Sequence, residues 1–128
     1  MSILITGGLG YIGSHIARLL KKKSVIIDNQ SNSLLNFKQY LPDATVYLSD
    51  LNKANLEKVF KKHDIKGVIH LAGLKASNES VSNPLKYYEN NIGSSMVLLK
   101  AMDKFKINKL IFSSSATVYG ISTFRIDP

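Results

Sequence analysis

The first fifteen residues constrain the fold most strongly, because an apolar run passes into a glycine cluster and then into an amphipathic segment. The apolar run, Ser2 to Thr6, reads S-I-L-I-T, and the cluster, Gly7 to Gly13, reads G-G-L-G-Y-I-G. The cluster fits both G-x-G-x-x-G and a threonine followed by G-x-x-G-x-x-G. A strand, a glycine turn and a helix in this order are typical of a dinucleotide-binding turn.

The glycines have separate physical roles in this prediction. A Cβ at Gly7 or Gly10 would keep the main chain away from a pyrophosphate, whereas Gly13 allows the helix to pack tightly against the strand. The free N–H groups at the start of the helix then face the phosphates. A glycine cluster alone is equally compatible with an ordinary turn, so the rest of the chain has to decide between the two interpretations.

Size and composition limit the classes of protein that fit. With 128 residues, 45% of them hydrophobic and 20% charged, the chain fits one folded domain rather than a disordered segment. No apolar run approaches the roughly 18 residues needed to cross a bilayer, and no basic region precedes the first apolar run as in a signal peptide. Cysteine is absent, which excludes disulfides and zinc–thiolate sites. We therefore expect a cytoplasmic protein without a membrane partner or a metal.

The net charge of +8 raises the question of a nucleic-acid partner. Lys21 to Lys23 end the first predicted helix, and Lys58, Lys61 and Lys62 lie at the end of another. Cations are favourable at helix C-termini, so we interpret these lysines as solvated helix ends and expect no nucleic-acid partner. A positive field also suits anionic ligands such as a dinucleotide or a sugar nucleotide.

The second predicted strand, Ser24 to Asp28 (S-V-I-I-D), indicates both the sheet type and the cofactor. Three β-branched residues in a row are typical of a strand buried on both faces of a parallel sheet. Asp28 follows Gly10 at close to the roughly 20 residues expected for the carboxylate that binds the adenosine ribose. A carboxylate there would repel a 2′-phosphate, which favours NAD over NADP. A turn or helix cap is the alternative role for Asp28.

The rest of the chain alternates apolar runs with segments of helical periodicity. With right-handed crossovers, this alternation predicts an α/β fold, a doubly wound (Rossmann) parallel sheet of five strands in the order 3-2-1-4-5. The further strands are expected at Ala44–Ser49, Gly67–Leu71 and Lys109–Phe112, and the helices at Tyr11–Lys22, Leu34–Tyr40, Asn52–Lys62 and Pro84–Phe105.

Apolar spacing predicts which faces of the first and the long helix are buried. Lys75 to Asn83 is polar and is expected to form a loop. The predicted buried residues are Ile12, Ile16, Leu19 and Leu20 in the first helix, and Tyr88, Ile92, Met96, Leu99 and Met102 in the long one.

Polar residues follow the predicted strands at their carboxyl ends, where open α/β sheets place their ligand site. Asp50 either faces an adenine or caps the next helix. The serine-rich stretch Ser113 to Gly120 follows the last strand, and His70, inside an apolar strand, is interpreted as a core residue rather than a catalytic one. Asn90 and Asn91 are unfavourable inside a helix, which indicates a specific role for one of them.

Five segments carry a resemblance to a known family. They read T-G-G-L-G-Y-I-G-S-H, D-N-Q-S-N-S, H-L-A-G-L-K, E-S-V-S-N-P-L-K-Y-Y-E-N-N and F-S-S-S-A-T-V-Y-G. Together they resemble the UDP-glucose 4-epimerases, which are extended short-chain dehydrogenase/reductases, over nearly the whole chain and in one order. The A-G-L-K and S-S-S-A-T-V-Y-G segments are specific within that superfamily.

The resemblance implies NAD as the cofactor and a set of residues that bind it. Tyr11 and Ile12 would contact the pyrophosphate through their main chain, and Asn90 would contact the cofactor from the long helix. Ser115 would hydrogen-bond the 4-hydroxyl of the sugar as a catalytic and substrate-binding residue, with Thr117 beside it in the substrate site. The residues implied around the adenosine and along the cofactor are Asp28, Asn29, Asn32, Ser33, Asp50, Leu51, Leu71, Ala72, Gly73 and Lys75.

The family interconverts UDP-galactose and UDP-glucose by moving a hydride from C4 of the sugar to NAD and returning it to the other face. A tyrosine near a lysine, spaced Y-x-x-x-K, removes the hydroxyl proton. None of the six tyrosines here has a lysine four residues later. Family members are also well over twice this length.

The sequence therefore predicts that residues 1–128 form a single but incomplete NAD-binding domain without the substrate domain, truncated after the fifth strand. We expect it to be the N-terminal part of such an epimerase and to be inactive alone. The alternatives are a non-catalytic NAD-binding module and a fragment of a related NAD-dependent sugar-nucleotide dehydratase. An uncovered apolar fifth strand predicts self-association, as a homodimer, or pairing with a complementary C-terminal chain.

Overall fold

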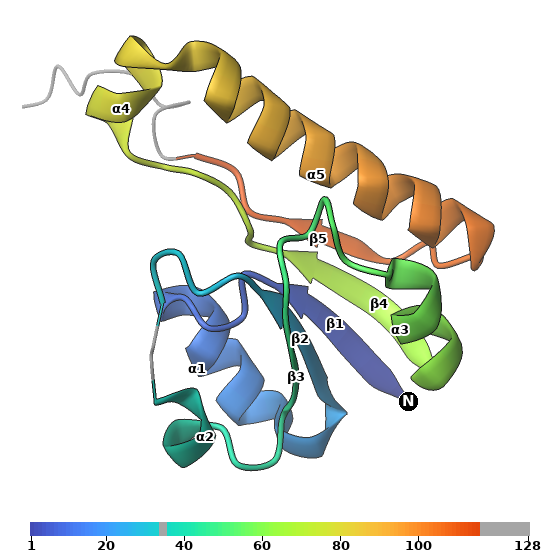
Figure 1. Cartoon of the computed structure of the whole chain (residues 1–128). Helices are drawn as coiled ribbons and strands as arrows, with labels where there is room; N and C mark the ends of the chain where they lie inside the picture. Colours follow the sequence, from blue (N-terminus) through green and yellow to red (C-terminus); the bar gives the residue numbers. More distant parts are fainter. Residues whose placement is uncertain (34–35, 116–128) are drawn as a thin grey trace, which may run out of the picture.

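The structure is a computed structural model that describes residues 1–33 and 36–115. Its framework is one parallel sheet (Figure 1). Within these residues its five strands pair in the order β3-β2-β1-β4-β5. This order confirms the predicted doubly wound α/β fold. The strands are β1 (Ser2–Thr6), β2 (Ser24–Asp28), β3 (Thr45–Leu48), β4 (Ile65–His70) and β5 (Leu110–Phe112).

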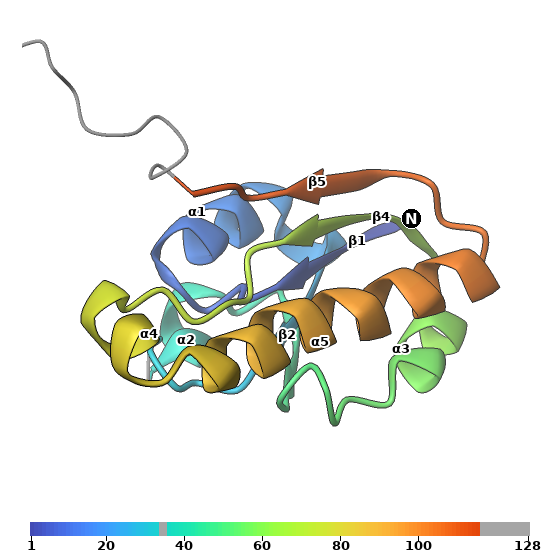
Figure 2. The ribbon, with the colours of Figure 1, turned by 90° about the horizontal axis from the view of Figure 1, so that it is seen from above.

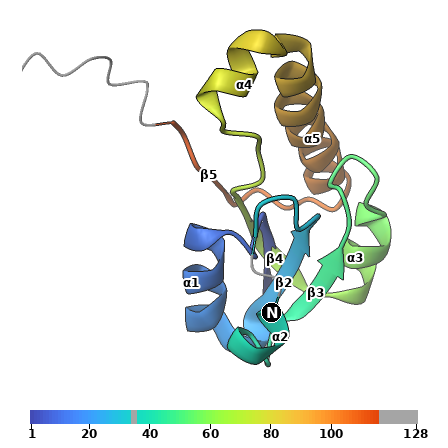
Figure 3. The ribbon, with the colours of Figure 1, turned by 60° about the vertical axis from the view of Figure 1, so that its left-hand side comes forward.

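Helices cover both faces of the sheet. In Figures 2 and 3, α1 lies on one side of the sheet and α3 with α5 on the other, as right-handed crossovers require. Pro84 is at the start of α5, where its missing N–H costs nothing. The helices are α1 (Tyr11–Leu20), followed by a 3₁₀ turn at Lys21–Lys23, α2 (Phe37–Tyr40), α3 (Leu56–Lys62), α4 (Ser77–Ser82) and α5 (Pro84–Lys104).

The core consists of two apolar layers, one on each face of the central strands. Leu4 packs in the layer that contains α3 and α5, whereas its neighbour Ile5 packs in the layer that contains α1 and α2. All five residues of β2 are buried, as the run of β-branched residues predicts. The central strands therefore hold the carboxyl edge of the sheet in a fixed place. No helix among the described residues combines the length and apolarity that crossing a membrane requires.

The predicted buried faces of α1 and α5 are correct only in part. In α1, Ile16 and Leu20 pack against the core as predicted. Ile12 and Leu19 are instead 56% and 83% exposed, while Gly13 and Ala17 are buried. Gly13 lies directly against the glycine turn, and this close approach turns the face of α1 that carries Gly13 and Ala17 toward the sheet. In α5, Met102 is buried as predicted, whereas Tyr88, Ile92, Met96 and Leu99 are exposed. The other buried residues of α5 are Ser94, Leu98 and Ala101.

Most other elements begin or end within three residues of the predicted bounds, but two segments differ more. The third helix begins at Leu56 rather than at Asn52, because the Asn55 side chain accepts a hydrogen bond from the Lys58 N–H (3.0 Å) and caps it. Asp50 is therefore not the helix cap. The expected loop at 75–83 contains α4, whose sequence S-N-E-S-V-S has no apolar period to reveal it.

Strand β5 forms an edge of the sheet and exposes apolar side chains, as predicted. Leu110, Ile111 and Phe112 are 38%, 63% and 60% exposed. Unpaired edges with exposed apolar residues favour association between chains.

We expect Ile111→Lys to raise the monomer fraction in sedimentation velocity. A charge on an edge strand disfavours edge-to-edge pairing, and the side chain is too exposed for the change to alter the free energy of unfolding by more than about 0.5 kcal/mol. Ile111→Val keeps the edge apolar and serves as the control. A wild-type chain that sediments as a monomer at all concentrations would contradict the predicted self-association.

Candidate functional site

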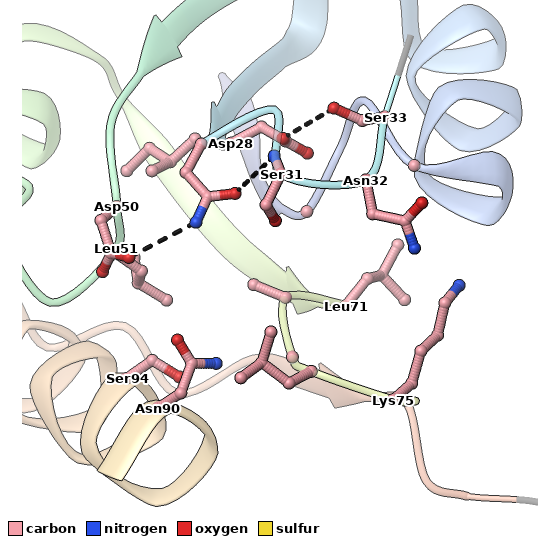
Figure 4. A pocket seen from close by; sticks show the side chains of 17 residues that line it. Asp28, Ser31, Asn32, Ser33, Asp50, Leu51, Leu71, Lys75, Asn90 and Ser94 are labelled. Atoms are coloured by element: carbon pink, nitrogen blue, oxygen red, sulfur yellow. Dashed lines mark hydrogen bonds between the residues drawn. The ribbon is translucent and has the colours of Figure 1, made fainter. Parts of the chain in front are cut away.

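A pocket opens at the carboxyl ends of the first four strands, beside the first half of α5 (Figure 4). This is the edge where open α/β sheets place their ligands. The lining residues come from the four segments that follow these strands and from α5: Gly7, Gly10, Ile27, Asp28, Asn29, Ser31, Asn32, Ser33, Asp50, Leu51, Leu71, Ala72, Gly73, Leu74, Lys75, Asn90 and Ser94.

At its first and last glycines, the turn between β1 and α1 has no room for a side chain. Gly7 has a φ of +69°, and a Cβ there would lie 2.8 Å from the main-chain nitrogen of Ala72. A Cβ at Gly13 would lie 2.5 Å from the carbonyl oxygen of Gly7. The first glycine thus brings the turn against the segment after β4, and the last brings α1 against the turn.

The N-terminus of α1 is open to an anion. Gly10 precedes the helix and provides no side-chain cap, and the first N–H groups of an α-helix lack intrahelical acceptors. A Cβ at Gly10 would meet only the Gly7 carbonyl oxygen, at 3.3 Å. This arrangement suits a phosphate group at the helix start.

The buried carboxylate of Asp28 connects two segments of the pocket. Its Oδ2 accepts a hydrogen bond from the Leu9 N–H (3.0 Å), and its Oδ1 accepts from the Gln30 N–H (2.7 Å) and the Ser33 hydroxyl (3.0 Å). Asp28 therefore acts as a turn cap, the alternative that its position left open. As a pure acceptor at the pocket wall, an ionised Asp28 also suits a ligand that donates hydroxyl hydrogens.

Asp50 lies across the pocket from the segment after β4 (Figure 4). Its Oδ2 accepts a hydrogen bond from the Asn29 side chain (3.4 Å), and its Oδ1 accepts from the Asn52 N–H (2.9 Å). These contacts join the segments after β2 and β3 into one wall.

A chain of hydrogen bonds fixes the carboxyl end of β4. The Thr6 hydroxyl contacts Nδ1 of His70 (2.5 Å), and Nε2 of His70 contacts the Ser95 hydroxyl (3.0 Å). Because that hydroxyl donates to the Asn91 carbonyl oxygen (2.8 Å), it accepts from His70, so the imidazole carries its proton on Nε2. His70 is buried and fully hydrogen-bonded, which agrees with its interpretation as a core residue.

We expect His70 to make the fold less stable in mild acid. Burial lowers the pKa of His70 from its ordinary value of 6.5, so the unfolded chain takes up the proton more readily. The stabilisation is complete above pH 6.5 and is lost as the pH falls below it. Between pH 7.5 and 5.5 the loss is about 1 kcal/mol in urea unfolding, and His70→Gln removes it.

His63 provides the reference for that experiment. Burial, and secondarily Lys62, lower the pKa of His63, so it adds a loss of the same sign. His63→Gln should therefore leave the His70 part of the pH dependence in place. A His70→Gln chain with the same pH dependence as wild type would contradict the assignment.

The two asparagines of α5 have different roles. Asn90 lines the pocket, whereas Asn91 bonds the main chain of Leu74 twice, accepting from its N–H (2.8 Å) and donating to its carbonyl oxygen (3.0 Å). The sequence indicated a role for one of the pair, and the structure assigns contacts to both.

The pocket brings together every predicted cofactor residue except Tyr11, Ile12 and Gly13. Tyr11 and Ile12 form the first turn of α1 with exposed side chains, and Gly13 is buried under the turn. Four lining residues were not predicted: Ile27, Ser31, Leu74 and Ser94. Ser94 follows Asn90 by one helical turn, a spacing that could have revealed it.

The predicted substrate residues lie beyond β5. Ser115 is exposed and is not among the pocket-lining residues, and Thr117 lies outside the described residues. The described part of the chain contains no group of three or more acidic, histidine or cysteine side chains that could hold a metal ion.

Comparison with known proteins identifies relatives of this chain. The UDP-glucose 4-epimerase of Bacillus subtilis is 47% identical over 130 residues, which cover 94% of this chain and 38% of the relative. The UDP-glucose 4-epimerase of Bifidobacterium longum, solved with NAD+ and UDP, has a TM-score of 0.84 and 43% identity, over 94% of this chain and 38% of that one. A UDP-N-acetylglucosamine 4-epimerase from Methanobrevibacter ruminantium has a TM-score of 0.81 and 39% identity, over 99% and 42%.

The alignments cover nearly all of this chain but less than half of each relative. The chain spans about 38% of the length of the curated relatives that it matches. Over its own length, however, the match is nearly complete, and a model of the NAD dependent epimerase/dehydratase family matches residues 3–127. With the glycine turn, the parallel sheet and the pocket at its carboxyl edge, the chain belongs to the NAD dependent epimerase/dehydratase family.

Proposed function

We propose that this chain binds NAD in the pocket and corresponds to the cofactor-binding part of a UDP-glucose 4-epimerase. The observation that carries the proposal is the placement of an uncapped helix N-terminus and the Asp28 carboxylate on one pocket. A dinucleotide needs both features, an anion site for its pyrophosphate and an acceptor for its ribose hydroxyls. The epimerase relatives favour this class over a dehydratase.

Different residues of the pocket bind different parts of the dinucleotide. The start of α1 holds the pyrophosphate through the main chain of Tyr11 and Ile12, and Asp28 holds the adenosine ribose with Asn29, Asn32 and Ser33 nearby. Asp50 and Leu51 flank the adenine. The segment Leu71 to Lys75 and Asn90 line the nicotinamide half. When bound, NAD supplies the hydride acceptor for chemistry at C4 of a sugar nucleotide.

The sugar side of the reaction depends on Ser115 and on a base. Ser115 hydrogen-bonds the 4-hydroxyl of UDP-galactose or UDP-glucose, and Thr117 lies beside it. No tyrosine of the chain has a lysine four residues later. Tyr87 is unsuited to be the base, because burial and the bond to Glu79 raise its pKa. This chain alone therefore binds NAD but does not turn over UDP-galactose or UDP-glucose.

Calorimetry and an epimerase assay test the two halves of this proposal. NAD should bind at least tenfold more tightly than NADP, because the Asp28 carboxylate repels a 2′-phosphate. Purified chain with NAD and UDP-galactose should form no UDP-glucose above the buffer control. Equal affinities would contradict the role of Asp28, and clear turnover would contradict the absence of a base.

The exposed edge at β5 favours a second part of the proposal, that another chain completes the enzyme. Beside this edge, Met1, Leu19, Ile69 and Ile111 line an apolar hollow on the α1 side of the sheet. Mixing the chain with the remaining part of the Bacillus subtilis relative should restore UDP-galactose turnover. If the mixture stays inactive and the two chains sediment separately, this part of the proposal fails.

A further inference from the structure

We propose that Tyr87, together with Glu79, is a positioning residue of the pocket: it fixes α4 onto α5 and thereby places Lys75. The inference rests on the proposed binding of NAD and names a residue outside the pocket that shapes its nicotinamide side. Tyr87 does not line the pocket, whereas Lys75 does, in the segment that leads into α4.

Lys75 lies at the end of the pocket away from the adenine side. Figure 4 shows its side chain on the opposite side from Asp50 and Leu51, with the long amine reaching along the opening. Lys75 is exposed and is separated from α4 only by Ala76. Asn91 holds the main chain of Leu74 on one side of Lys75. On its other side, the position of the Lys75 main chain depends on how α4 is held.

Apolar packing does not hold α4 in place. Val81, its large apolar residue, is 83% exposed, and no α4 side chain that is described belongs to either core cluster. The helix has six residues, too few to be stable through its own hydrogen bonds. Polar contacts to α5 must therefore fix its position.

Two of the polar contacts that fix α4 converge on one hydroxyl. The Tyr87 hydroxyl lies 2.9 Å from the Ala76 carbonyl oxygen, next to Lys75, and 3.0 Å from Oε2 of Glu79 in the first turn of α4. Lys86 forms an ion pair with the other oxygen of Glu79. One side chain of α5 thus holds both the residue after Lys75 and the start of α4.

The ionisation states keep this cluster intact near neutral pH. The hydrogen bond from Lys86, followed by that from Tyr87, lowers the pKa of Glu79, so its carboxylate stays charged. Tyr87 keeps its proton, because its pKa is raised, first by burial and then by Glu79. A protonated phenol beside a carboxylate and a carbonyl is a hydrogen-bond donor with two acceptors in reach.

The variant Tyr87→Phe tests the proposal, with Tyr88→Phe as its matched control. Tyr88 is the neighbouring residue on α5 and is 63% exposed. We expect Tyr87→Phe to weaken NAD binding about fivefold in calorimetry while AMP, which fills only the adenosine side, binds within twofold of wild type. Tyr88→Phe should change neither affinity.

A second readout does not require NAD. The amide hydrogens of Ser80 and Asn83 bond within α4, to Ala76 (3.0 Å) and Glu79 (2.8 Å). They should exchange with solvent at least tenfold faster in Tyr87→Phe than in wild type. Glu79→Ala should have the same effect, and the double variant should add little, because both side chains act in one cluster.

The outcomes separate this inference from the proposed function. If wild type fails to bind NAD, the proposed function is wrong, and the exchange rates alone decide whether Tyr87 holds α4. An equal loss of NAD and AMP affinity in Tyr87→Phe would indicate general destabilisation and overturn the positioning role. Unchanged NAD affinity or unchanged exchange in α4 would overturn it as well.

Discussion

Replacing Gly7 with alanine should lower the free energy of unfolding by about 2–4 kcal/mol, measured by urea denaturation. Gly7 has a φ of +69°, a conformation that side chains disfavour. A Cβ would also lie 2.8 Å from the Ala72 nitrogen, and this neighbour is main chain that cannot rotate away. We expect the variant to lose NAD binding as well, because the turn and the segment after β4 both line the pocket.

Gly10→Ala is the matched control, since it adds the same methyl group to the same turn. The φ of Gly10 is −70°, which alanine adopts readily, and its Cβ would meet only the Gly7 carbonyl oxygen. We expect the fold to lose less than about 1 kcal/mol while NAD binding falls, because the methyl group enters the pocket. A Gly7→Ala chain as stable as Gly10→Ala would contradict the geometry of the turn.

Asp28→Ala should have the second large effect, on stability and on binding. The substitution leaves the N–H groups of Leu9 and Gln30 without their acceptor, and such losses at buried sites cost about 1–3 kcal/mol each. We expect the free energy of unfolding to fall by about 2–4 kcal/mol in urea. NAD affinity should fall more than tenfold in calorimetry, since the acceptor for the ribose hydroxyls is also removed.

Asp50→Ala is the control for this variant. Asp50 also lies at the carboxyl end of the sheet and accepts from a main-chain N–H and a side chain, but it is only partly buried. Its loss should change the free energy of unfolding by less than about 1 kcal/mol. If the two variants are equally stable, Asp28 does not connect the glycine turn to the loop after β2 as described.

The sheet could be predicted because its signals are local. The β2 strand at Ser24–Asp28 has the predicted bounds, since a run of β-branched residues ending in an acid has few other interpretations. The glycine turn indicated where the strand before it ends and where the helix after it begins. Right-handed crossovers then left one simple strand order, and most of the predicted cofactor residues line one pocket at the carboxyl edge.

The buried faces of α1 and α5 could be predicted only in part, because they depend on contacts between distant segments. Ala17 faces the core instead of Leu19, because Gly13 brings α1 against the turn. In α5, apolar residues occupy two faces, and periodicity does not distinguish the side that meets the sheet from the exposed side. The contacts of Asn91 with Leu74 and of Tyr87 with Ala76 join α5 to the segment before α4, and no local sequence pattern predicts them.

The most direct test of the account is a titration of the isotopically labelled chain with NAD, followed by amide resonances. We expect saturable shifts at the glycine turn, around Asp28 and in the segment Leu71 to Lys75, with the α3 amides unchanged. AMP should reproduce only the shifts around Asp28 and Asp50. The absence of shifts at millimolar NAD, or shifts centred on α3 and its lysines, would contradict the account.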